Sequence, residues 1–186
     1  MEKKVVSSLA KNAPELMDQI KRMPNTVKFT PTANPWFPEA SGTMTGGQLI
    51  PYNTINIAPE VLRGRLPAAV QQAYPQFAKT TGKADIFANL PAVVAHEAQH
   101  AVNSANRNFH ALEPGQQTLM AIDTMQAMKR APGEVSKQGL EQIKEALTGG
   151  SKLAADESLA YLRQHQVART RALLPLANEM LGMETK

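Results

Sequence analysis

The chain has 186 residues, 42% of them hydrophobic and 5% aromatic, with a net charge of +4 and no cysteine. This length suits one domain with its own core better than two, so we predict a single domain over residues 1–186. Lys and Arg are scattered along the chain and form no dense run, which gives no reason to expect a nucleic-acid partner. The lack of Cys excludes disulfides and thiolate metal ligands.

No segment of the sequence predicts a membrane span or a signal peptide. The start of the chain is basic but has no apolar stretch, and no later run approaches the length that is needed to cross a bilayer. We therefore expect a soluble protein. Export by a specialised machine that reads a polar N-terminus and a cytoplasmic location both stay open.

The first third of the chain predicts one helix followed by short strands. Asn12 can cap a helix that has Pro14 in its first turn, and apolar residues at helical spacing continue almost to Pro24. After this helix, Pro, Gly, Thr and Asn separate three β-prone runs at 27–29, 48–50 and 54–57. We expect them to form a small antiparallel sheet.

Beyond Pro59 the sequence predicts five helical segments. Pro and Gly mark the breaks between them, at residues 75, 80–83, 113–115, 131–133 and 148–151. The predicted fold class is therefore α+β, with a small antiparallel sheet followed by a mainly helical region.

A polar pentapeptide stands inside one of these helices. Asn89 can cap a helix that has Pro91 in its first turn, and an apolar run follows. Its middle reads His96-Glu97-Ala98-Gln99-His100. Residues at i and i+4 share one helical face, so His96 and His100 can present their imidazoles to one metal ion. Glu97 is rotated by about 100° from His96 and points beside that position.

These residue types suit hydrolysis that depends on zinc. Neutral imidazole binds zinc at about 2.0–2.1 Å and leaves positions open, and the ion lowers the pKa of a bound water towards about 7. A carboxylate beside the ion can take a proton from the attacking water and pass it to the leaving amine. We therefore predict Zn²⁺ as the cofactor, His96 and His100 as ligands and Glu97 as the catalytic base.

The pentapeptide resembles the active-site helix of the zincin metallopeptidases. The metzincin branch takes a third histidine six residues after the second, where this chain has Asn106. The gluzincin branch takes a glutamate from a later helix. Glu157 lies in a run whose apolar face predicts such a helix, with Ser151 as its cap. The resemblance implies a zincin-like fold in which this later helix supplies Glu157 as the third metal ligand.

Other residues stay open for these roles. The tetrahedral oxyanion formed in hydrolysis needs a hydrogen-bond donor, and Tyr161, one turn after Glu157, is the predicted catalytic donor. His165, another turn on, is the alternative donor, although a surface or helix-terminal position also suits it. The alternative third ligands are His110, Glu113, Asp123 and Asp156.

The two helices are also similar to small bacterial metallopeptidases of the toxin and secreted-effector type, in the order Glu157, Ala160, Tyr161, Gln164. The zincin resemblance implies an endopeptidase whose protein or peptide substrate binds as an added strand at the sheet edge, for which Gln48–Ile57 is the candidate. The second similarity implies an inhibitor or immunity protein as partner. Trp36 and Phe37 are candidates for a substrate subsite. The competing interpretation is a non-catalytic binding module that zinc stabilises by joining helices.

Overall fold

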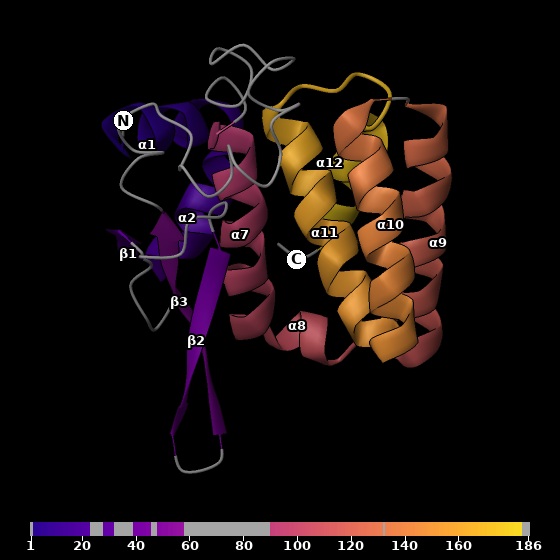
Figure 1. Cartoon of the computed structure of the whole chain (residues 1–186), viewed down its shortest axis with the longest axis horizontal. Coiled ribbons are helices and arrows are strands. Elements are labelled where there is room, and N and C mark those ends of the chain that lie inside the picture. The colour runs from indigo at the N-terminus through magenta and orange to yellow at the C-terminus, as the bar shows by residue number, and fades with distance from the viewer. Residues whose placement is uncertain are drawn as a thin grey trace, which may run out of the picture.

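The computed structural model of the chain describes residues 2–22, 28–31, 39–45, 48–57, 90–131 and 133–183. In these ranges the protein is mainly helical (Figure 1). The predicted α+β fold with an antiparallel sheet is therefore wrong. Helices predominate from the N-terminus on, and the few short strands pair in both directions.

The strands β1 (Lys28–Pro31), β2 (Glu39–Thr45) and β3 (Gln48–Ile57) pair in the order β1-β3-β2. β2 and β3 are antiparallel, whereas β1 is parallel to β3. β1 and β2 therefore lie on opposite sides of β3, and the sheet is mixed. Since β3 is paired on both sides from Thr54 to Asn56, the prediction that Gln48–Ile57 is an edge strand is wrong for that stretch.

Two helices at the N-terminus pack against α7 (Leu90–Ala105). They are α1 (Glu2–Asn12) and α2 (Pro14–Arg22), so Asn12 ends the first helix instead of capping the second. α1 was not predicted. Together with Ile55 of β3 and Val167, these three helices form one buried apolar cluster, to which α7 contributes most residues: Leu90, Ala92, Val94, Ala95, Ala98, Ala101 and Val102.

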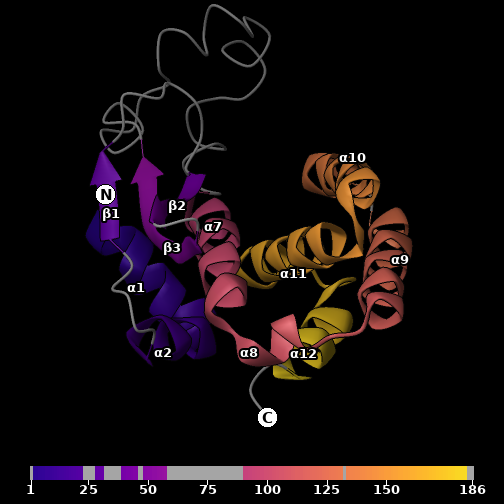
Figure 2. The same ribbon diagram turned by 90° about the horizontal axis from the view of Figure 1, so that it is seen from below.

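The C-terminal half of the chain is a bundle around α11 (Ser151–Val167). α11 packs against α7 and against three further helices, α9 (Pro114–Arg130), α10 (Glu134–Gly149) and α12 (Leu174–Met183) (Figure 2). Their apolar faces form a second buried cluster, which includes Phe109 of the short helix α8 (Arg107–His110). The contact between α7 and α11 therefore joins the two clusters.

The boundaries of these helices confirm three of the predicted breaks, at 113–115, 131–133 and 148–151. The predicted breaks at 75 and 80–83 and the cap at Asn89 lie outside the described residues. Ser151 was predicted as the cap of α11, but it is the first residue of the helix, and its hydroxyl donates to Gln117 Oε1 at 2.7 Å. Within the described ranges, no helix has both the length and the apolar character to cross a membrane.

The C-terminal end of α11 generates a prediction about stability. Arg169 has φ of 59°, its N–H donates to Gln166 O at 3.1 Å, and the Thr170 N–H donates to His165 O at 3.0 Å. This is the Schellman arrangement, in which glycine is favoured. Because a left-handed conformation costs an L-residue roughly 1–2 kcal/mol, we expect Arg169→Gly to raise the free energy of unfolding by up to about 1 kcal/mol in urea denaturation.

Arg171→Gly is the matched control. Among the described residues other than glycine, Arg169 alone has a positive φ, so glycine at position 171 only increases the entropy of the unfolded chain. We expect this control to be less stable than the wild type. A stability loss of the same size in both variants would contradict the proposed strain at Arg169.

Candidate metal centre

α7 is apolar on the side that faces the first cluster and polar on the side that faces α11. Four of its polar side chains recur at positions i, i+3, i+4 and i+7 and therefore share one helical face. Each of them contacts α11, and together they form what we call the polar stripe: His96, Gln99, His100 and Asn103. The stripe is almost fully buried, so each side chain needs a partner across the contact.

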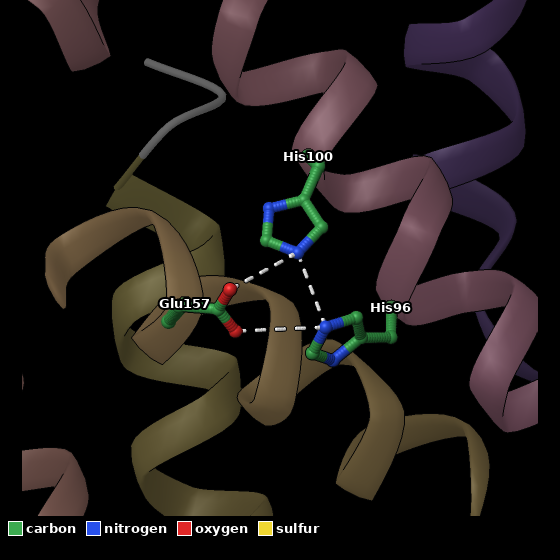
Figure 3. A group of neighbouring side chains, drawn as sticks. All are labelled: His96, His100 and Glu157. Atoms are coloured by element: carbon green, nitrogen blue, oxygen red, sulfur yellow. Dashed lines mark hydrogen bonds and ion pairs between the residues drawn. The ribbon is translucent and has the colours of Figure 1, made fainter. Parts of the chain in front are cut away.

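The two histidines of the stripe converge with Glu157 of α11 (Figure 3). His96 Nε2 lies 3.1 Å from His100 Nε2. Glu157 Oε2 is 3.7 Å from His96 Nε2, and its Oε1 is 3.8 Å from His100 Nε2. The three ligand atoms lie within 4.8 Å of one another, so this group could hold a metal ion.

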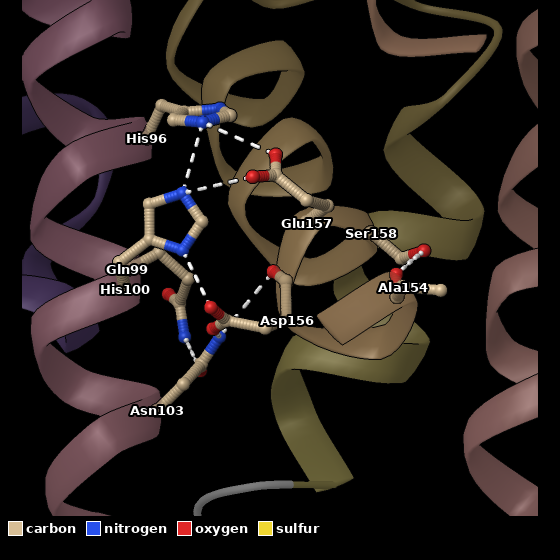
Figure 4. Close-up of polar contacts among 8 residues, drawn as sticks. All are labelled: His96, Gln99, His100, Asn103, Ala154, Asp156, Glu157 and Ser158. Carbon is tan, nitrogen blue, oxygen red and sulfur yellow. Dashed lines mark hydrogen bonds and ion pairs between the residues drawn. The ribbon is translucent and has the colours of Figure 1, made fainter. Parts of the chain in front are cut away.

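Asp156 contacts the other nitrogen of one of these rings. Its Oδ2 lies 2.9 Å from His100 Nδ1, and its Oδ1 accepts from Asn103 Nδ2 at 2.7 Å (Figure 4). A carboxylate on the outer nitrogen of a metal-binding histidine orients the ring and raises its basicity. Asp156, one of the alternative third ligands, is therefore placed to hold His100 instead of the ion.

Burial and charge move the two histidines in opposite directions. Burial lowers the pKa of His96 well below its ordinary value, and the nearby charge of His100 lowers it further against the opposing effect of Gln164. Burial also lowers the pKa of His100, but the hydrogen bond and the charge of Asp156, with the charges of Glu157 and Glu97, outweigh it and raise the pKa to about 9. The acids thus make the site favourable for a positive charge.

Tyr161 lies against the metal group from α11. Its ring meets the His96 ring edge to face, with centroids 4.5 Å apart, and only 3% of the residue is exposed. Burial raises the pKa of Tyr161, and the charges of Glu157 and Glu97 raise it further. The phenol therefore keeps its proton, and both carboxylates are near enough to influence it.

The structure separates the remaining candidates from this group. His110 is exposed and its Nε2 lies 3.0 Å from the Ser104 carbonyl oxygen. Glu113 and Asp123 do not join the metal group either. Ser158, next to Glu157 in the sequence, is buried, and its hydroxyl donates to the Ala154 carbonyl oxygen at 2.6 Å (Figure 4). The predicted subsite residues Trp36 and Phe37 lie outside the described residues.

Sequence reasoning missed three polar residues of the contact, namely Gln99, Asn103 and Arg163. Arg163 is 1% exposed and its Nε donates to Gln99 Oε1 at 2.8 Å. The signal for the first two was present, because they follow His96 by three and seven residues and interrupt an otherwise apolar helix. The position of Arg163 depends on the packing of α11 against α7 and has no local signal.

Comparisons with other proteins find no relative. No protein-family profile matches the chain, and neither the search of curated proteins nor that of solved structures finds a significant match.

The geometry predicts metal binding that depends on Glu157. We expect the purified protein to bind one divalent ion per chain, and Glu157→Ala to weaken the binding more than about 100-fold, because even residues that only support a ligand contribute about 10- to 100-fold. Competition with a chromophoric chelator measures both affinities. Glu141→Ala, which removes an exposed carboxylate from α10, is the control and should bind as the wild type does.

His165 lies in the last turn of α11, which confirms the predicted helix-terminal position, but it is buried, so the surface alternative is wrong. It is 3% exposed, its Nδ1 lies 3.0 Å from Thr170 Oγ1, and its Nε2 has no hydrogen-bond partner among the described residues. Burial lowers its pKa to about 4. It does not belong to the metal group.

This burial gives the stability of the protein a pH dependence. The pKa of histidine in an unfolded chain is about 6.5. The unfolded state therefore binds one more proton between about pH 6.5 and pH 4, and stability falls as the pH drops through that window. We expect the wild type to lose up to about 3 kcal/mol of its free energy of unfolding in this way, and the His165→Gln variant to show no such loss. Urea denaturation in EDTA at about pH 7 and pH 4.5 measures the difference, and an equal loss in both proteins would contradict the assignment.

Proposed function

We propose that the protein is a zinc-dependent hydrolase of peptide bonds, with His96, His100 and Glu157 as the metal ligands and Glu97 as the general base. The observation that carries the proposal is the convergence of two imidazole nitrogens and a carboxylate from two facing helices. The delivery of the protein as an effector or toxin, and its inhibition by an immunity protein, rest on the sequence resemblance and stay predictions.

The separations of the ligand atoms fit zinc. Ligand atoms at about 2.0–2.2 Å from one zinc ion and at tetrahedral angles lie about 3.3–3.6 Å from one another. Here the two Nε2 atoms are 3.1 Å apart, Glu157 Oε2 is 3.7 Å from His96 Nε2, and Glu157 Oε1 is 3.8 Å from His100 Nε2. Glu157 thus faces each imidazole with a different oxygen, and each separation is within about 0.2 Å of that range. Two histidines and one glutamate are also a ligand set of catalytic zinc sites, which keep a fourth position open for water or substrate. In such a site, zinc acts as a Lewis acid towards the peptide carbonyl.

The neighbourhood of Glu97 supports its role as the general base. It follows His96 in α7, and its charge raises the pKa of both His100 and Tyr161, so its carboxylate lies close to the metal group. A carboxylate in this place takes the proton of the attacking water and afterwards donates it to the leaving nitrogen. The half-buried state of Glu97 keeps it within reach of water.

Tyr161 supplies the second electrostatic contribution. Because its pKa is raised, the phenol stays protonated and can donate a hydrogen bond to the oxygen that becomes negative in the transition state. Its buried ring is fixed against His96, which limits the reorganisation that the reaction requires. His165, the alternative donor, is buried outside the metal group and does not share this contact with His96.

A second candidate function is a zinc-stabilised binding module. The position of the metal group between the two apolar clusters favours it, because an ion that bridges α7 and α11 would hold the clusters together. Structural zinc sites are, however, almost always closed by four protein ligands, and the group has three among the described residues. Full zinc occupancy without hydrolysis of any member of a peptide library would decide for this second function.

Replacing the base tests the catalytic proposal. We expect Glu97→Ala to keep its zinc and to lose at least about 100-fold in kcat, because general acid–base catalysis contributes about 10²- to 10⁴-fold. Zinc content and peptide cleavage are measured on the same preparation. Glu145→Ala, an exposed glutamate of α10, is the control and should keep full activity. Unchanged turnover in Glu97→Ala would refute the mechanism.

A further inference from the structure

A continuous chain of hydrogen bonds runs from a buried arginine to the metal group. Arg163 Nε donates to Gln99 Oε1 at 2.8 Å, and Gln99 Nε2 donates to Asn103 Oδ1 at 2.7 Å. Asn103 Nδ2 donates to Asp156 Oδ1 at 2.7 Å, and Asp156 Oδ2 lies 2.9 Å from His100 Nδ1 (Figure 4). Arg163, Gln99 and Asn103 are each at most 1% exposed, so water hardly competes for these bonds.

The guanidinium of Arg163 and the carboxylate of Asp156 together fix which group donates and which accepts in each of these hydrogen bonds. A guanidinium has only donors, so Gln99 must turn its oxygen towards Arg163 and its NH₂ towards Asn103. Asn103 then accepts with its oxygen and has its own NH₂ left for Asp156. A carboxylate has only acceptors, so its second oxygen must accept a hydrogen bond from the N–H at His100 Nδ1.

We infer that Asp156, oriented by Asn103, Gln99 and Arg163, is a positioning residue that keeps the proton of His100 on Nδ1 and leaves Nε2 as the metal-binding nitrogen. The inference deepens the proposed function and rests on it. The distances agree with this assignment, because Nε2 is the nitrogen of His100 that faces His96 and Glu157. This series of hydrogen bonds affects the metal only through His100.

An isosteric change at Asp156 should therefore move the proton of His100 from Nδ1 to Nε2. In Asp156→Asn, the direction imposed by Arg163 makes the new amide oxygen accept from Asn103, so the new NH₂ faces His100. His100 Nδ1 then has to accept, and the proton moves to Nε2, where it blocks the metal. The shape of the side chain is kept, and only the direction of one hydrogen bond is reversed.

Moving the carboxylate from position 156 to position 103 should restore the hydrogen bond in which His100 Nδ1 is the donor. In the double variant Asp156→Asn with Asn103→Asp, the carboxylate at position 103 accepts from both Gln99 and the amide at position 156. The amide oxygen at position 156 is then free to accept from His100 Nδ1. The control is Asp156→Asn with Asn108→Asp, which has the same net charge and the same two kinds of substitution. Asn108 is an exposed residue of α8 and takes no part in the series of hydrogen bonds from Arg163 to His100.

Zinc affinity, measured by competition with a chromophoric chelator, and the visible spectrum of the Co²⁺-substituted protein test the inference. We expect Asp156→Asn to bind zinc about 10- to 100-fold more weakly and to change the Co²⁺ spectrum. The Asn103→Asp double variant should recover at least about tenfold of that loss and the wild-type spectrum, whereas the Asn108→Asp control should recover neither. A cooperative melting transition in EDTA checks that each variant folds.

The failures of the two proposals are distinguishable. A wild-type protein that binds no zinc would refute the metal centre itself. A wild type that binds zinc, together with an Asp156→Asn variant that binds it equally well, would refute only the role of the chain. Recovery that is equal in the Asn103→Asp and Asn108→Asp double variants would also refute it, because it would show that charge alone, and not direction, sets the affinity.

Discussion

Polar side chains between two packed helices are costly unless each one finds a partner, and this constraint governs the contact between α7 and α11. The polar stripe of α7 meets Asp156, Glu157 and Arg163 of α11, and hydrogen bonds join His100 and Asn103 to Asp156 and Gln99 to Arg163. Because each of the two helices also belongs to an apolar cluster, the polar contact sets how the two halves of the protein meet.

The charges at this contact explain why it suits a cation. Two histidines side by side and out of water would ordinarily repel any additional positive charge, and burial lowers the pKa of both. Asp156, Glu157 and Glu97 reverse this for His100, and burial raises the pKa of Glu157 itself. A divalent ion among these groups would relieve the mutual repulsion of the acids while it replaced a proton between the rings.

The sequence predicted what depends on a single helix and missed what depends on packing. The spacing of His96 and His100 fixes their shared face locally, and the later helix with Glu157 followed from its apolar pattern and a family resemblance. The parallel pairing of β1 was missed because short β-prone runs do not reveal the order of the strands. The whole of α1 was missed because the N-terminal segment is rich in polar residues. Arg163 meets Gln99 across 64 positions of the chain, which no periodicity reveals.

The adjacency of Asp156 and Glu157 has a consequence for recognising related chains. One dipeptide supplies both the carboxylate that faces the two Nε2 atoms and the carboxylate that faces Nδ1 of His100. A sequence descended from a common ancestor with this protein should therefore keep more than the short motif of two histidines and a glutamate. It should carry glutamine and asparagine three and seven positions after the first histidine, and far downstream an Asp-Glu pair followed six positions later by arginine. That signature distinguishes inheritance from chance resemblance, since the motif of five residues recurs in unrelated helices.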